Sequence, residues 1–87
     1  MEVLKVKVIS PQDVLYDGEA QAISSKNVGG VFDVLPQHSD FITIVENQPI
    51  VIKTLQKDKL TFQFPLAVIY VHQNIATIYA KTAPPTL

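Results

Sequence analysis

Alternation of apolar and polar residues, with a period of two, is the dominant pattern along this chain. In residues 3–9, apolar side chains at positions 4, 6 and 8 alternate with lysines at positions 5 and 7. This pattern is typical of a strand with one buried face. Similar patterns predict strands at residues 14–16, 19–24, 31–35, 41–46, 50–55, 60–64, 66–71 and 75–80. No segment keeps a helical period over three turns.

Turn-forming residues separate these predicted strands. Pro11 lacks a backbone donor, the pair Asp17 and Gly18 predicts a tight turn, and the two glycines in residues 26–30 predict a loop. Pro36 favours extended geometry in the residue before it and ends the strand there. Short strands with frequent turns indicate an all-β fold, either an antiparallel β-sandwich of about eight to ten short strands or a small barrel.

Length and composition restrict the class of protein. The 87 residues provide room for one core, so we expect a domain over residues 1–81 and a proline-rich tail over residues 82–87. No stretch approaches the roughly 18 apolar residues of a spanning helix, and we expect no direct insertion into a membrane. The N-terminus is not typical of a signal peptide. Cysteine is absent, which excludes a disulfide framework and a thiol nucleophile and fits a reducing cytoplasm.

The charge pattern argues against nucleic acid as a partner. Seven basic and eight acidic residues give a formal net charge of −1, and every basic residue is a lysine. Without arginine the chain lacks the planar fork that suits phosphates and guanine edges, and its lysines are scattered. This composition favours a partner that is met through apolar and uncharged polar surface.

The adjacent residues His38, Ser39 and Asp40 have the side chains of a catalytic triad. In an extended segment Ser39 would point away from both neighbours, whereas a triad needs the histidine between the hydroxyl and the acid. No G-x-S-x-G motif provides a nucleophile elsewhere. We therefore expect a loop histidine that bonds to nearby backbone.

A metal site centred on His38 is the next candidate. His38 and Asp40, with Asp33 or Asp17 in reach, could hold a divalent ion. His72 is the other histidine, and it lies in a different predicted turn, so we expect no metal site. The glycine pair 29–30 enters a strand and has no following lysine, so it does not match a phosphate loop. We expect no cofactor, no small-molecule substrate and no enzymatic activity.

Two motifs resemble a known family. The stretch "LKVKVISPQDVLYDGEAQAI" followed by "GGVFDVLPQH" is similar to the N-terminal β-sandwich of the epsilon subunit of rotary F-type ATP synthases. That family has a motif ending in "G-E" after its second strand and a signature close to "G-x-F-G-I-L-P-G-H-A-P". The matching residues are Gly18 and Glu19 for the first motif, and Gly30, Phe32, Leu35, Pro36 and His38 for the signature.

The chain departs from this family pattern at several positions. Asp33 and Gln37 replace signature glycines, Ser39 and Asp40 replace the alanine and proline, and Val31 replaces an acidic residue that is common there. Beyond residue 46 the resemblance rests on the strand pattern alone. Family members usually carry a C-terminal helical hairpin that can inhibit ATP hydrolysis. The sequence stops before that segment, either as a naturally short subunit or as a piece of a longer one, and the resemblance implies the structural role without the inhibitory role.

The resemblance implies partners and their contact residues. It predicts a central-stalk subunit that links the gamma subunit to the proteolipid ring, at the cytoplasmic side of an energy-transducing membrane, or in the matrix or stroma of an organelle. Gly18, Phe32, Leu35 and Pro36 belong to the structural signature, and residues 66–71 and 75–80 are candidates for gamma binding. The residues expected to contact the ring are Lys26, Asn27, Val28, Gly29, Gly30, Val31 and His38.

Two other hypotheses stay open at this point. A free-standing β-sandwich that binds an unrelated protein would have the same strand pattern. A metal-assisted hydrolase centred on His38 is the third hypothesis, and it has the least support from the sequence.

Overall fold

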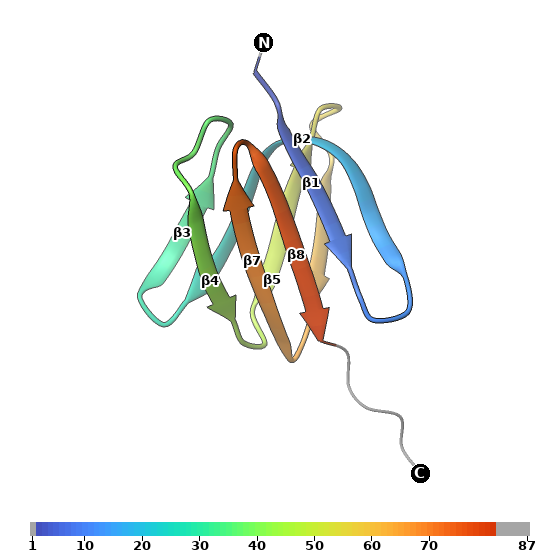
Figure 1. The fold of residues 1–87 in the computed structure, drawn as a ribbon, viewed down its shortest axis with the longest axis vertical. Coiled ribbons are helices and arrows are strands. Elements are labelled where there is room, and N and C mark those ends of the chain that lie inside the picture. Colours follow the sequence, from blue (N-terminus) through green and yellow to red (C-terminus); the bar gives the residue numbers. More distant parts are fainter. Residues whose placement is uncertain (1, 82–87) are drawn as a thin grey trace.

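The computed structural model describes residues 2–81, and this part of the chain is all-β (Figure 1). Its eight strands follow one another without a helix between them. They are β1 (Leu4–Ile9), β2 (Val14–Asn27), β3 (Gly30–Val34), β4 (Phe41–Val45), β5 (Pro49–Thr54), β6 (Lys59–Gln63), β7 (Leu66–His72) and β8 (Ile75–Lys81). The predicted tail, residues 82–87, lies outside the described residues.

The long strand β2 belongs to both layers of the fold. Its first half pairs with β1, and its second half pairs with β3 on one edge and with β5 on the other. A register irregularity between Ala20 and Ala22 marks the passage from one layer to the other, as a bulge that bends a strand would. One layer therefore has the order β4-β7-β8-β1-β2, and the other contains β3, β2, β5 and β6 (Figure 1).

The predicted all-β sandwich is confirmed, with one pairing that the sequence pattern did not predict. Neighbouring strands are antiparallel except β1 and β8, which run parallel. The hairpin predicted from residues 50–55 and 60–64 is present as β5 and β6. The predicted strands 66–71 and 75–80 pair with each other as β7 and β8.

The core lies between the two layers and is built from alternate residues of each strand. In β1, Leu4 and Val8 are each 0% exposed, while the two lysines of that strand point to solvent, as the alternation predicts. The opposite layer contributes Ile50 and Ile52, which are also 0% exposed. The core is thus a continuous apolar layer with strands on both sides.

One predicted turn is wrong, and one predicted loop is shorter than expected. Asp17 and Gly18 lie within β2, where they pair with Lys7 and Val6 of β1, because the ladder to β1 overrides the local turn preference. A Cβ on Gly18 would lie 3.1 Å from the hydroxyl oxygen of Tyr16, so the glycine accommodates that ring within the strand. The predicted loop 26–30 is mostly strand, because Asn27 pairs with Gly30 and the turn is limited to two residues.

Candidate functional site

The structure separates the predicted contact residues into two groups. Residues 26–31 form the tip of the hairpin between β2 and β3. His38 lies in the loop between β3 and β4, and strand β3 lies between these two places. Figure 1 shows the β2–β3 turn at one end of the sandwich and the β3–β4 loop at the other end, beside the turn between β7 and β8. Residues 26–31 are therefore together, and His38 is not with them.

The β2–β3 tip is apolar, exposed and tied to its surroundings by Asn27. Val28 is 104% exposed and Val31 is 78% exposed. The Asn27 side chain accepts a hydrogen bond from the Gly29 N–H at 2.8 Å and donates one to the hydroxyl oxygen of Thr43 at 2.9 Å. Gly30 has φ +119°, which side chains other than hydrogen rarely tolerate. The tip therefore presents apolar side chains on a fixed backbone.

The signature residues after the tip connect the β3–β4 loop to the core. The Phe32 ring lies 5.5 Å from the Phe41 ring, centroid to centroid, and both pack against the core. The His38 backbone N–H donates to the Leu35 carbonyl at 3.1 Å, which closes a turn that contains Pro36. Leu35 itself is 55% exposed. The signature thus combines an aromatic anchor with a tight turn.

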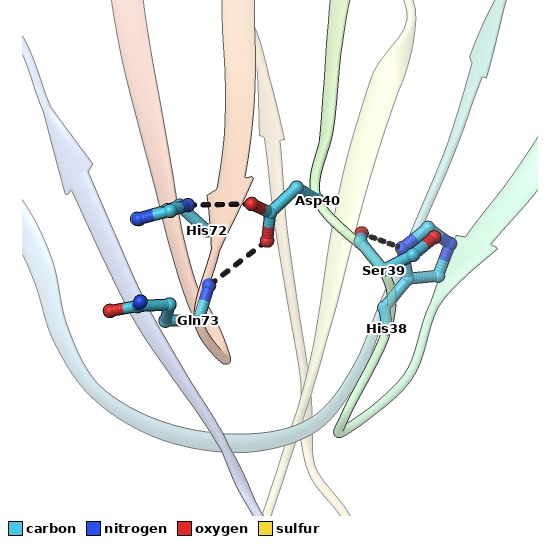
Figure 2. Close-up of polar contacts among 5 residues, drawn as sticks. All are labelled: His38, Ser39, Asp40, His72 and Gln73. Carbon is cyan, nitrogen blue, oxygen red and sulfur yellow. Dashed lines mark hydrogen bonds and ion pairs between the residues drawn. The ribbon is translucent and has the colours of Figure 1, made fainter.

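His38 and Asp40 face different partners. The Nδ1 of His38 lies 2.7 Å from the Ser39 carbonyl oxygen (Figure 2). A carbonyl only accepts, so this nitrogen carries the hydrogen and Nε2 stays available to another group. The carboxylate of Asp40 instead lies 2.7 Å from Nδ1 of His72. The geometry of a triad, with the histidine between hydroxyl and acid, is not formed by these residues.

His72 lies in a different turn from Asp40, as the sequence predicted, but the two side chains are in contact. The second oxygen of Asp40 accepts the Gln73 backbone N–H at 3.2 Å. The His72 hydrogen bond, followed by the Gln73 N–H, holds the pKa of Asp40 below its ordinary value. Within residues 2–81 no three His, Asp or Glu side chains gather closely enough to hold a metal ion. The pair is therefore a structural contact between two turns.

The outer surface of one layer is unusually apolar. Paired residues on neighbouring strands share a face, so the register places Ile42 beside Tyr70, and Val68 beside both Ile44 and Tyr79. We call this surface the apolar face, and its residues are Ile42 (66% exposed), Ile44 (54%), Val68 (half-buried), Tyr70 (40%), Ile75 (47%) and Tyr79 (48%). A shallow hollow of about 600 Å³ extends it toward Val28 at the tip.

The outer surface of the other layer is polar. Lys53 lies opposite Lys59, Ser24 opposite Asp33, and the exposed Thr61 points the same way from β6. The half-buried Val51 also faces this way, between Ser24 and Thr61. The two layers therefore bury similar inner faces but present different outer faces. The sequence indicated β7 and β8 as candidates for a partner-binding surface. The contribution of β4 was missed, because both alternating sets of its residues contain apolar side chains and the pattern does not indicate which set is buried.

Among residues 2–81 there is no helix with the length and apolarity that crossing a membrane requires.

Comparisons with known sequences identify relatives over nearly the whole chain. The family model of the β-sandwich domain of the ATP synthase delta/epsilon chain matches residues 3–86. The ATP synthase epsilon chains of Brevibacillus brevis and Acinetobacter baylyi are 26% and 24% identical, each over 83 residues. These alignments cover 95% of this chain and 63% and 60% of the relatives, so the chain spans about three fifths of their length. The epsilon chain of Micrococcus luteus is 27% identical over 63 residues, which are 72% of this chain and 69% of the relative.

Solved structures share the fold at lower identity. A chain in the cryo-EM structure of the Euglena gracilis mitochondrial ATP synthase, with OSCP, F1 and c-ring, matches with a TM-score of 0.84 and 11% identity. The match covers 92% of this chain and 51% of that one. A chain in the central stalk and c-ring structure of the Tetrahymena thermophila mitochondrial ATP synthase matches with a TM-score of 0.75 and 14% identity, over 88% of this chain and 62% of that one. At these identities the likeness shows the fold alone.

Proposed function

This chain belongs to the family of the β-sandwich domain of the ATP synthase delta/epsilon chain, and we propose that it acts as a non-catalytic central-stalk subunit of such a synthase. In this role it links the gamma subunit to the proteolipid ring during ion-driven ATP synthesis. The names of its relatives and the complexes in which its fold occurs support this proposal. The subunit would be peripheral, at the cytoplasmic side of the membrane, or in the matrix or stroma of an organelle.

The apolar face is the surface that we assign to the gamma subunit. Five of its six side chains are at least 40% exposed, from Tyr70 at 40% to Ile42 at 66%. Contiguous exposed apolar surface of this kind is typical of a protein contact, and aromatic residues are enriched among the residues that contribute most to binding. On the outer surface of the other layer, apolar residues such as Val31 and Val51 are separated by polar ones. This asymmetry is the observation on which the proposal depends most.

The β2–β3 tip, residues 26–31, is the surface that we assign to the ring. It lies at one end of the sandwich, and the hollow between Val28 and Ile44 makes it continuous with the apolar face. His38 lies at the other end, in the loop that Asp40 connects to His72 beside the β7–β8 turn (Figures 1 and 2). We therefore assign His38 to the gamma contact and remove it from the ring contact that the sequence predicted.

The mechanism that follows is mechanical. A sandwich whose strands form one hydrogen-bonded sheet resists deformation, so a domain fixed to gamma on one face and to the ring at one end would transmit torque between them. The chain contributes contact surface and stiffness to this role, and no bond is made or broken by its residues.

Affinity purification tests this proposal. The tagged chain is expressed in its source organism, and the proteins recovered from mildly solubilised membranes are identified by mass spectrometry. We expect to recover the gamma subunit and the ring subunit together. The control is a tip variant with Val28→Asp and Val31→Asp, which should retain gamma and lose direct contact with the ring. Recovery of neither subunit with a folded wild-type chain would contradict the proposal.

A further inference from the structure

The turn between β7 and β8 holds the β3–β4 loop through side chains that are far apart in the sequence. Asp40 contacts His72 at 2.7 Å and accepts the Gln73 backbone N–H at 3.2 Å. The Gln37 backbone N–H donates to the side-chain oxygen of Asn74 at 2.8 Å. Figure 2 shows the Asp40 carboxylate between the His72 ring and the Gln73 nitrogen. Both ends of the segment 37–40 are therefore fastened to the same turn.

The turn between β7 and β8 is itself fixed by contacts that do not involve the β3–β4 loop. Gln73 and Asn74 have φ values of 49° and 65°, the left-handed geometry of a tight two-residue hairpin turn. The Asn74 side chain donates to the Val3 carbonyl at 2.7 Å, and the Asn74 carbonyl accepts the Lys5 N–H at 3.2 Å. The turn is thus tied to β1 as well as to its own strands, so it can act as a rigid support.

The loop has few other restraints. His38 packs edge-on against Phe41 with a centroid distance of 5.5 Å, and its N–H closes the turn at Leu35. Gln37 adopts φ 67°, a conformation that is unfavourable for a residue with a long side chain. A segment with this geometry needs external bonds to stay in one conformation.

We propose that Asp40, His72, Gln73 and Asn74 form a clasp that holds the β3–β4 loop in a single conformation, and that Asp40 and Asn74 thereby fix the position of His38 in that loop. The clasp follows from the contacts alone, whereas its effect on binding rests on the function proposed above. Asp40 and Asn74 are positioning residues, because their bonds act on the loop and not on a partner.

Amide hydrogen exchange measured by NMR tests the clasp without any partner. In Asp40→Ala the acceptor of the Gln73 N–H is removed, but the acceptor of the Gln37 N–H remains, so Gln37 reports whether the loop is released. We expect the Gln37 amide to exchange about threefold to tenfold faster, while the core amide of Ile69 keeps its rate. The reciprocal variant Asn74→Gly, which tolerates the left-handed turn, should accelerate the Gln73 amide in the same way.

Asp58→Ala in the β5–β6 turn is the matched control, because it removes an exposed carboxylate from another turn. It should leave both reporter amides unchanged. Gln37 exchange within twofold of wild type in Asp40→Ala would overturn the clasp, as would equal acceleration at Ile69, which would indicate global destabilisation. Asp40→Asn should give an intermediate rate, because it keeps an acceptor for the Gln73 N–H and loses the charge.

Binding to the cognate gamma subunit tests the positioning role. His38→Ala, Asp40→Ala and the double variant form a cycle, and we expect the double variant to bind no more weakly than the weaker of the two single variants. Additive losses would overturn the positioning role. If the wild-type chain fails to bind gamma, the proposed function fails, while the exchange experiment still decides the clasp.

Discussion

Replacement of Asn74 should measure how much one turn side chain contributes to stability by joining three segments. The side chain accepts from the Gln37 N–H at 2.8 Å and donates to the Val3 carbonyl at 2.7 Å. A neutral intramolecular hydrogen bond contributes about 0.5–1.5 kcal/mol, so Asn74→Gly should lower the free energy of unfolding by about 1–3 kcal/mol from these two bonds. Glycine also increases the entropy of the unfolded chain, which adds about 0.5 kcal/mol.

Asn74→Ala separates the effect of backbone geometry from the effect of the bonds. It loses the same two bonds, but alanine at φ 65° has a further cost of about 1–2 kcal/mol. The alanine variant should therefore be less stable than the glycine variant by about 0.5–1.5 kcal/mol. Urea unfolding followed by circular dichroism measures both values. The reasoning would be refuted if the alanine variant were the more stable of the two, or if both variants lost less than about 0.5 kcal/mol.

Three further predictions concern other elements. Thr54 is 8% exposed and its hydroxyl has no hydrogen-bond partner among residues 2–81, so Thr54→Val should raise the free energy of unfolding by about 1 kcal/mol, with Thr54→Ser as the control that keeps the hydroxyl. Gly30→Ala at φ +119° should lower it by about 1–3 kcal/mol, and Gly29→Ala, without positive φ, should cost less; chemical denaturation compares them. The pKa of Asp40 is lowered in the folded state, so its stabilising contribution should be complete above the ordinary value of 3.8 and lost as the pH falls through the lower folded value. The Gln73 amide should then exchange faster only in that acid range, relative to the intrinsic rate, and a loss near neutral pH would contradict this assignment.

The positions of the strands along the sequence were predictable because apolar and polar residues alternate in most of them. Leu4 and Val8 of β1 are buried as the period of two requires, and the hairpin of β5 and β6 follows from two patterned segments with a short polar turn. The strand geometry of Asp17 and Gly18 was not predictable from local preference, which favours a turn there, since the ladder to β1 determines it. The parallel pairing of β1 with β8 depends on contacts between the two ends of the described chain, which no local pattern encodes.

The candidate site was predictable only in part, for a related reason. The glycine-containing tip and the loop histidine were found from the signature, but their separation by β3 was not, because a sequence does not give the direction of each strand. The contact of Asp40 with His72 spans 32 residues and depends on the register of β4 against β7. In β7 both alternating sets are apolar, so the pattern could not indicate which set faces outward.

The central claim is that the apolar face binds the gamma subunit, and a comparison of two single variants by isothermal titration calorimetry with the purified cognate gamma subunit tests it most directly. Tyr79→Glu places a charge on the apolar face, and Thr61→Glu places the same charge on the polar outer surface of the other layer. Both side chains are exposed, so both variants should fold. Desolvating a charge in an interface is costly, and we expect Tyr79→Glu to weaken binding by at least about 30-fold and Thr61→Glu by less than about threefold. Equal affinities of Tyr79→Glu and wild type, or a larger loss in Thr61→Glu, would contradict the claim.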